Sequence, residues 1–302
     1  MKIYLIELFY LALLLCSGCS HAQTQGNIPS GGKEQFTLPQ IPDSLRIPQK
    51  RADYLVIHYW DNFDFRDTVL THKPEITEQA FADFIPVLSI ASEAKVRQGI
   101  NILLEKASNG SQIMFTYFTG LCEKYLHNPN SPLRNEELYI PCLQYIISSN
   151  RVGDADKERP KYQLEMALKN RPGTIATDFT YTLANDKTGK LSLLKANYAV
   201  LFFNNPDCQD CKRVKAYMDA SPVFHSVAVL AIYVDEDLPL WLKADYPRFM
   251  INAYDAGQVI EKKKLYDLKA IPTLYLLDKE KRVILKDAPI DEIERWLKEH
   301  IE

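Results

Sequence analysis

The chain has 302 residues, a hydrophobic content of 46% and a formal net charge of −3. This length exceeds that of an average single domain and predicts two domains. The near balance of 36 basic and 39 acidic residues excludes the strongly basic class of nucleic-acid-binding proteins, so we predict no nucleic-acid partner.

The N-terminus has the pattern of an export signal. Lys2 precedes an apolar run over residues 8–15 that is too short to span a bilayer. Two small residues stand directly before Cys19, which resembles the lipobox of bacterial lipoproteins. The resemblance implies a signal peptide over residues 1–18, lipidation of Cys19, and a location in the cell envelope, facing the periplasm and anchored to a membrane. Ordinary cleavage near Ala22 is the alternative.

Residues 19–50 are rich in polar residues and proline without an apolar period, and we predict a flexible tether there. The next part of the chain, residues 51–170, predicts an irregular bundle of helices with no repeat. The first expected helix begins near Thr77. Four more are expected at residues 92–108, 111–126, 135–149 and 161–169. The stretch at residues 52–65 and the later run Asn-Pro-Asn-Ser-Pro-Leu-Arg-Asn-Glu-Glu-Leu-Tyr at 128–139 resemble a helical domain of unknown function that precedes thioredoxin-like modules in bacterial lipoproteins. The resemblance covers most of residues 50–165 and implies no activity.

Residues 52–65 form the densest aromatic stretch of the chain. Two interpretations are open for its rings. They are a ligand platform, or the core of the helical bundle, and the second is favoured because large apolar rings are usually buried. The side chains concerned are His58, Tyr59, Trp60 and Phe63.

Cys122 and Cys142 flank the loop at Pro132 almost symmetrically. In an antiparallel helical hairpin this symmetry brings them to similar heights. Whether they face each other depends on the rotation of each helix, which sequence does not determine. We favour buried free thiols over a structural disulfide.

From residue 171 onwards the pattern alternates between strands and helices. Residues 198–203 are wholly apolar, as in a buried strand, and Asn204, Asn205 and Pro206 end the run. An insert is expected around residues 246–267. The other expected elements are strands at 227–234, 274–278 and 282–285, and helices at 238–244 and 289–300.

Cys208 and Cys211 follow the first of these strands, on the first turn of a helix that Asp207 is expected to cap. Their spacing puts both sulfurs on one face, close enough for a disulfide. The free amides of a helix N-terminus also stabilise a thiolate. The pair therefore predicts a reactive dithiol. A zinc half-site, which lacks a second cysteine pair, and a purely structural disulfide are the alternatives.

This order of elements, with the cysteine pair and the later Ile271-Pro272-Thr273, resembles the thioredoxin fold over residues 171–302. The opening of this part and its insert are similar to the membrane-anchored TlpA and ResA subfamily. The resemblance implies a thioredoxin-like α/β domain with a central mixed sheet flanked by helices. The whole chain would then be α+β, with helical residues 51–170 before it.

The resemblance also implies roles for individual residues. Cys208 would attack, Cys211 would resolve, and Pro272 would follow a cis bond beside them. Ile271 and Thr273 would bind the substrate, with Ile271 and Pro272 offering backbone groups to an extended chain. It implies no cofactor and no metal.

The sequence departs from the family at two positions. Asp207 stands where tryptophan usually precedes the first cysteine, and Phe202 stands where thioredoxin has a buried acid. The proton acceptor for Cys211 is therefore unassigned. Asp235 and Glu236 are candidates, although a solvated loop is the favoured interpretation of both. A peroxiredoxin is excluded, because Leu201 and Asn205 stand at the set positions where that family needs proline and threonine before its cysteine.

We hypothesise an exported, lipid-anchored thiol–disulfide oxidoreductase that reduces protein disulfides through Cys208 and Cys211. Its partners would be protein or small-molecule disulfides, an unidentified electron donor and, through the lipid, a membrane. Asp207 and Asp210 disfavour a second negative charge on the Cys208 sulfur, which indicates a reductant. The alternative is a binding or scaffolding lipoprotein whose thioredoxin-like domain is inactive.

Overall fold

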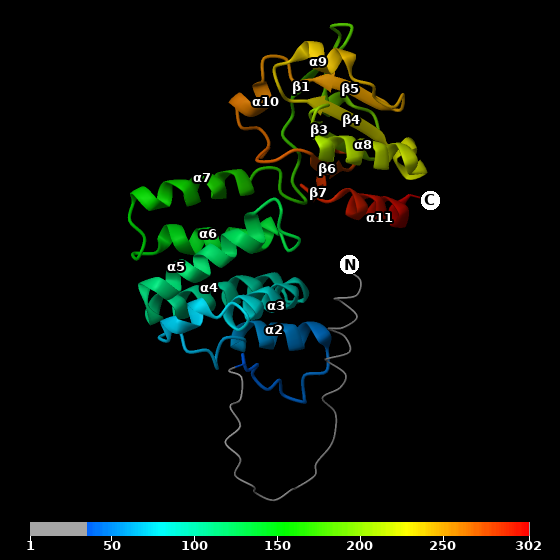
Figure 1. The fold of residues 1–302 in the computed structure, drawn as a ribbon. Helices are drawn as coiled ribbons and strands as arrows, with labels where there is room; N and C mark the ends of the chain where they lie inside the picture. The colour runs from blue at the N-terminus through cyan, green and yellow to red at the C-terminus, as the bar shows by residue number, and fades with distance from the viewer. Residues whose placement is uncertain (1–34, 302) are drawn as a thin grey trace, which may run out of the picture. The chain divides into compact units, whose positions relative to one another are not determined.

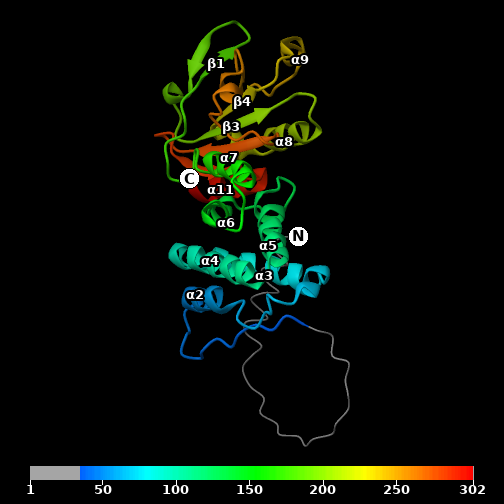
Figure 2. The same cartoon turned by 90° about the vertical axis from the view of Figure 1, so that its left-hand side faces the viewer.

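The computed structural model describes residues 35–301. Figures 1 and 2 show a helical region, residues 36–167, and a sheet region, residues 180–301, which carries one mixed sheet. The α+β class expected from the sequence is therefore confirmed. Across the described residues, no helix is both long and apolar enough to cross a membrane. The expected signal peptide and the expected lipidation site, Cys19, lie outside the described residues.

The helices predicted for the helical region are present, with ends shifted by a few residues. One further helix precedes them, and a π-helical turn at Glu123–His127 extends the third predicted helix. The helices are α2 (Pro48–His58), α3 (Thr77–Ile90), α4 (Glu93–Gly110), α5 (Gln112–Cys122), α6 (Glu136–Ser148) and α7 (Glu158–Ala167).

The predicted tether is too long at its C-terminal end. Helix α2 already begins at Pro48, and the ring of Phe36 lies 5.1 Å from that of Tyr59 and 5.2 Å from that of Trp60. Phe36 thus packs on the helical region, although most of residues 37–50 are exposed. Composition missed this because one aromatic side chain in a polar, proline-rich stretch is enough to attach it.

The aromatic stretch forms the core of the helical region, as favoured. Tyr59, Trp60 and Phe63 are buried, and Trp60 makes edge-to-face contacts with Phe84 and Phe118 at centroid distances of 5.7 and 5.2 Å. His58 remains partly exposed and binds Asp61.

Helices α2 and α4 approach closely at Gly99. A Cβ atom at this position would lie 2.2 Å from Cγ1 of Val56, nearer than van der Waals contact allows. Glycine is therefore required where these two helices meet.

The sheet has the strand order β2-β1-β5-β4-β3-β6-β7. Strands β3, β4 and β5 are parallel to one another, and the remaining pairs are antiparallel. The strands are β1 (Thr180–Leu183), β2 (Thr188–Lys190), β3 (Ala199–Asn204), β4 (Ala228–Tyr233), β5 (Met250–Tyr254), β6 (Thr273–Leu277) and β7 (Val283–Lys286).

Helices cover both faces of the sheet, and β3 is buried along its whole length. On one face, α8 (Gln209–Ala220) and α11 (Ile290–His300) pack through Val214, Met218, Ile293 and Leu297. On the other face, Ile260 of α10 (Val259–Lys262) joins the core. The short helix α9 (Leu238–Lys243) follows β4.

The expected insert contains β5 and α10, which the sequence did not predict. Strand β5 carries a polar residue at its centre, Asn252, whose side-chain oxygen Oδ1 accepts a hydrogen bond from Trp241 Nε1 at 2.7 Å. Only pairing with β4 identifies this segment as a strand.

The two regions meet at the buried ammonium of Lys286, whose side chain is 5% exposed. Lys286 Nζ lies 2.6 Å from Glu136 Oε2, in the first turn of α6. It also donates to the carbonyl oxygens of Met166, Ala167 and Lys169, at and just beyond the end of α7. A cation there satisfies carbonyls that a helix end leaves unpaired.

A second contact joins Arg134, before α6, to Asp287, after β7. The Arg134 guanidinium lies 3.0 Å from Asp287 Oδ2 and also donates to the Asp287 carbonyl oxygen at 2.6 Å. Burial nevertheless raises the pKa of Asp287 to about 6, from 3.8, because desolvation outweighs the attraction of Arg134.

This raised pKa predicts a pH-dependent contribution to stability. The folded state holds the Asp287 proton more tightly, so this contribution is largest below about pH 4 and is lost as the pH rises through about 6. The Asp287→Asn variant has no carboxyl group to titrate, so it lacks this pH dependence. Asparagine also tolerates the local φ of 46°. The difference in unfolding free energy, variant minus wild type, should rise by up to about 3 kcal/mol between pH 4 and pH 7.

Urea or thermal unfolding across this range measures the difference. The contributions of titratable groups that wild type and variant share cancel in this difference. Glu294 is one of them, and hydrogen bonds from Ser221 and Tyr217 lower its pKa to about 2. A difference that stays constant from pH 4 to pH 7 would contradict the prediction.

Candidate functional site

The two cysteines lie at the junction of β3 and α8. Strand β3 ends at Asn204, four residues follow, and α8 begins at Gln209. The N-cap is Cys208 itself, because its sulfur accepts a hydrogen bond from the Cys211 amide at 3.2 Å. The expectation that Asp207 caps this helix is therefore wrong. The same contact places the Cys208 sulfur at the positive end of the helix dipole.

The Ile271-Pro272 loop lies against the first cysteine. Cys208 Sγ is 3.7 Å from the carbonyl oxygen of Ile271, and the peptide bond between Ile271 and Pro272 is cis, as the family resemblance implies. Thr273 is buried, starts β6 and pairs with Phe203 of β3. The structure thus brings together all the site residues predicted for the sheet region.

The two thiols differ in exposure. Cys208 is half-buried, whereas Cys211 is buried, and both are unbonded. Burial, together with the hydrogen bond that the Cys211 thiol shares with Cys208, raises the pKa of Cys211 to about 12. Cys208 can therefore meet a substrate sulfur from outside, while Cys211 stays protonated behind it. This arrangement suits an attacking and a resolving thiol.

The charges around the dithiol are more balanced than the sequence indicates. Arg213 lies 3.3 Å from Asp210, its neighbour on α8, in a pair that is 69% exposed on each side. Lys215 is directed elsewhere, with its ammonium 5.0 Å from the centre of the Tyr246 ring. The ion pair of Asp210 is exposed to solvent, so it offsets only part of the carboxylate charge.

Asp235 and Glu236 are the candidate proton acceptors for Cys211. Asp235 accepts a hydrogen bond from the Asn205 side chain, whose oxygen in turn accepts from the Asp207 amide at 2.7 Å. It is thereby tied to the turn before Cys208. Neither Asp235 nor Glu236 is among the groups that shift the pKa of Cys211. In the place of a buried acid, the apolar Phe202 packs with Cys211 in the same core cluster.

Sequence reasoning missed a polar pair close to Cys211. Asn204 is buried at the end of β3, and its side-chain oxygen accepts a hydrogen bond from the Tyr246 hydroxyl at 2.6 Å. Burial and the nearby Cys211 raise the pKa of Tyr246, so it remains a proton donor. The sequence signal was Asn204 itself, which had been interpreted only as a strand breaker.

The second cysteine pair is separate from this site. Cys122 of α5 and Cys142 of α6 are buried, unbonded and face each other, so the favoured interpretation is confirmed. The Cys142 thiol also donates to the Leu138 carbonyl at 3.5 Å. Burial, and the hydrogen bond with Cys122, raise its pKa well above the ordinary value.

Comparison with known families matches the N-terminal half of the chain. Residues 17–170 match the family described as a domain of unknown function, DUF5106. This match covers about half of the chain. No curated protein is similar to the chain.

Solved structures match both halves. A thioredoxin-like protein from Bacteroides caccae ATCC 43185 is 45% identical, with a TM-score of 0.84, over 89% of this chain and 100% of that one. The C-terminal domain of an uncharacterized protein from Bacteroides fragilis NCTC 9343 is 46% identical over 43% of this chain and 98% of that domain, with a TM-score of 0.42. A domain of a possible thiol-disulfide isomerase from Cytophaga hutchinsonii is 22% identical over 44% of this chain and 95% of that domain, with a TM-score of 0.38.

The contact between Tyr246 and Asn204 makes a prediction about stability. Tyr246→Phe leaves the buried oxygen of Asn204 without its donor, which should cost about 1–3 kcal/mol of unfolding free energy. Tyr254→Phe is the matched control, because the Tyr254 ring packs on Trp241 at 4.9 Å and its hydroxyl bonds to none of the described residues. Denaturant unfolding measures both, and equal losses would contradict the assignment.

Proposed function

The chain belongs to the DUF5106 family and carries a thioredoxin-like domain, and on this premise we propose that it is a thiol–disulfide oxidoreductase that reduces protein disulfides. The observation that carries the proposal is the position of Cys208. Its sulfur lies at the start of α8, beside the Ile271 carbonyl, with the buried Cys211 one helical turn away. The spacing of the two cysteines and their unequal burial support different roles, with Cys208 as the attacking thiol and Cys211 as the resolving thiol.

The reaction starts from the dithiol. The Cys208 thiolate attacks one sulfur of the substrate disulfide, a mixed disulfide forms, and the first substrate thiolate leaves. Cys211 then passes its proton to the first substrate thiolate and attacks the Cys208 sulfur. The bond between Cys208 and the second substrate sulfur breaks and releases the second thiolate. Two electrons have passed to the substrate, and Cys208 and Cys211 end as a disulfide. An electron donor, itself a dithiol, must reduce that disulfide before the next turnover.

A binding or scaffolding protein is the second candidate. Asp207 in place of tryptophan and Phe202 in place of a buried acid favour it, because both remove groups that thioredoxins use. Measured disulfide reduction separates the two candidates.

Two cysteine substitutions test the division of labour. Cys208→Ser should reduce disulfide-reductase activity to background, because it removes the attacking sulfur. Cys211→Ser should retain attack but not release, so a mixed disulfide with the substrate should accumulate and be visible on non-reducing gels. Cys142→Ala is the control, since its thiol lies in the other pair. Activity that survives in Cys208→Ser would refute the proposed role of that residue.

The direction of electron flow is the second point to test. Asp207 precedes Cys208, and Asp210 is only partly offset by Arg213, so the thiolate gains less stabilisation than in strongly oxidising members of the fold. A reductant should have a potential nearer to the roughly −270 mV of thioredoxin than to the roughly −120 mV of a strong periplasmic oxidant. Removal of either charge, in Asp207→Asn or Asp210→Asn, should raise the potential by about 10–20 mV.

Equilibration of the purified protein against glutathione buffers gives these potentials. Asp219→Asn is the matched control, because Asp219 is exposed near the far end of the same helix. A reduction potential close to that of the oxidant would overturn the assignment as a reductant. So would shifts in potential in Asp207→Asn and Asp210→Asn that are no larger than the shift in the control.

Export and lipid attachment at Cys19 belong to the same proposal. The apolar run and the small residues before Cys19 support them. A reductant in an oxidising compartment needs a continuing supply of electrons, because its dithiol would otherwise drift to the disulfide.

A further inference from the structure

A segment beside the dithiol has an unpaired backbone. Residues 267–271 run between α10 and β6 without secondary structure. Within the described part of the chain, none of their amides donates a hydrogen bond, and the carbonyl oxygens of Asp267, Leu268 and Lys269 accept none. An extended chain could pair with such an edge by strand addition.

Lys269 shows that this backbone faces outward. The residue as a whole is exposed, yet its side chain is only 19% exposed, because its ammonium binds Glu136 at 3.2 Å and Asp267 at 3.0 Å. The exposed surface of Lys269 therefore lies mainly on its backbone. The side chain anchors the segment while the peptide groups remain accessible.

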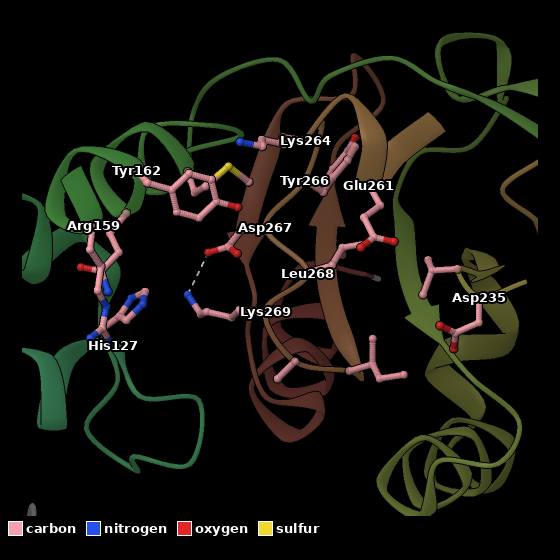
Figure 3. A pocket seen from close by; sticks show the side chains of 15 residues that line it. His127, Arg159, Tyr162, Asp235, Glu261, Lys264, Tyr266, Asp267, Leu268 and Lys269 are labelled. Atoms are coloured by element: carbon pink, nitrogen blue, oxygen red, sulfur yellow. Dashed lines mark hydrogen bonds and ion pairs between the residues drawn. The ribbon is translucent and has the colours of Figure 1, made fainter. Parts of the chain in front are cut away.

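The same segment lines a cavity of about 530 Å³ between the two regions (Figure 3). The opposite wall is formed by Arg159, Tyr162 and Gln163 of α7. One end of the cavity reaches Ile271, whose carbonyl lies 3.7 Å from Cys208 Sγ. A volume of this size is typical of ligand-binding sites.

The side chains of the α7 wall suit a polypeptide. Tyr162 is 47% exposed as a residue, with the Lys264 ammonium 4.5 Å from its ring centre, and the Arg159 side chain is 72% exposed. Tyrosine and arginine are among the residue types enriched where proteins bind other polypeptides. Asp235 and Glu261 lie at the other side of the cavity, so the lining carries both signs of charge and does not select a ligand of one charge (Figure 3).

We infer that this cavity holds an extended polypeptide segment that flanks the target disulfide, paired with the backbone of residues 267–271 and covered by Tyr162 and Arg159 of α7. Five extended residues span about 15 Å, so the segment can engage several substrate residues at once. The helical region then selects disulfides in extended polypeptides over small disulfides. This inference rests on the proposed oxidoreductase function and assigns the substrate class of its site.

The test uses the full chain with two substrates. One is glutathione disulfide, and the other is a pair of linear peptides joined by a single disulfide with apolar residues on both sides of each cysteine. Tyr162→Ala should lower the ratio of the two kcat/KM values, peptide over glutathione disulfide, about tenfold, as expected for the loss of one aromatic anchor. Arg159→Gln should lower the ratio less, in the same direction.

Lys161→Gln is the matched control and should leave the ratio unchanged, because Lys161 lies on the same helix, does not line the cavity and pairs with Glu158 at 2.7 Å. Equal loss of turnover with both substrates in Tyr162→Ala would overturn the inference and indicate a site for small disulfides. An unchanged ratio would overturn it as well.

A binding measurement keeps this result separate from the proposed activity. A chain with both Cys208→Ser and Cys211→Ser cannot react, and calorimetry should still detect the peptide disulfide bound to it. Adding Tyr162→Ala to this chain should raise the Kd for the peptide disulfide about tenfold. If the wild type reduces neither substrate, the proposed function fails, and this measurement still decides the inference. Binding that is absent, or that is insensitive to Tyr162→Ala, would contradict it.

Discussion

The arrangement of the two regions depends on the burial of the Lys286 ammonium. Transfer of an isolated charge from water into a protein interior costs several kcal/mol, so a buried lysine is stable only where partners converge on it. Here Glu136 supplies the opposite charge, and the end of α7 supplies carbonyl oxygens. Strand β7, the start of α6 and the end of α7 must therefore keep one relative position.

The same set of charges extends to the dithiol. Glu136 binds Lys269 with its second carboxylate oxygen, and Lys269 is also held by Asp267. Both residues belong to the segment that ends at Ile271, beside Cys208. The helical region thus helps to position one wall of the site, although no residue of it takes part in the proposed exchange of disulfides.

Short-range patterns accounted for most of the sheet region. The wholly apolar run ending at Phe203 is the buried central strand, and the cysteine pair follows it on the first helical turn. Two of the expectations that failed needed a distant partner. Phe36 is held by rings more than twenty residues away, and β5 is recognisable only beside β4. The cap of α8 is Cys208 because its sulfur, and not the Asp207 carboxylate, meets the Cys211 amide.

The sequence by itself determined the order of the elements, the dithiol on a helix N-terminus and the loop of Ile271 and Pro272. These depend on neighbours within a few residues, through apolar period and turn chemistry. Tertiary structure decided which charges act on the dithiol and what lies opposite it. Asn205 binds Asp235, 30 residues away, and α7 faces residues 267–271 across the cavity. Glu136 and Lys269 are 133 residues apart, and only the packing of both regions brings such groups together.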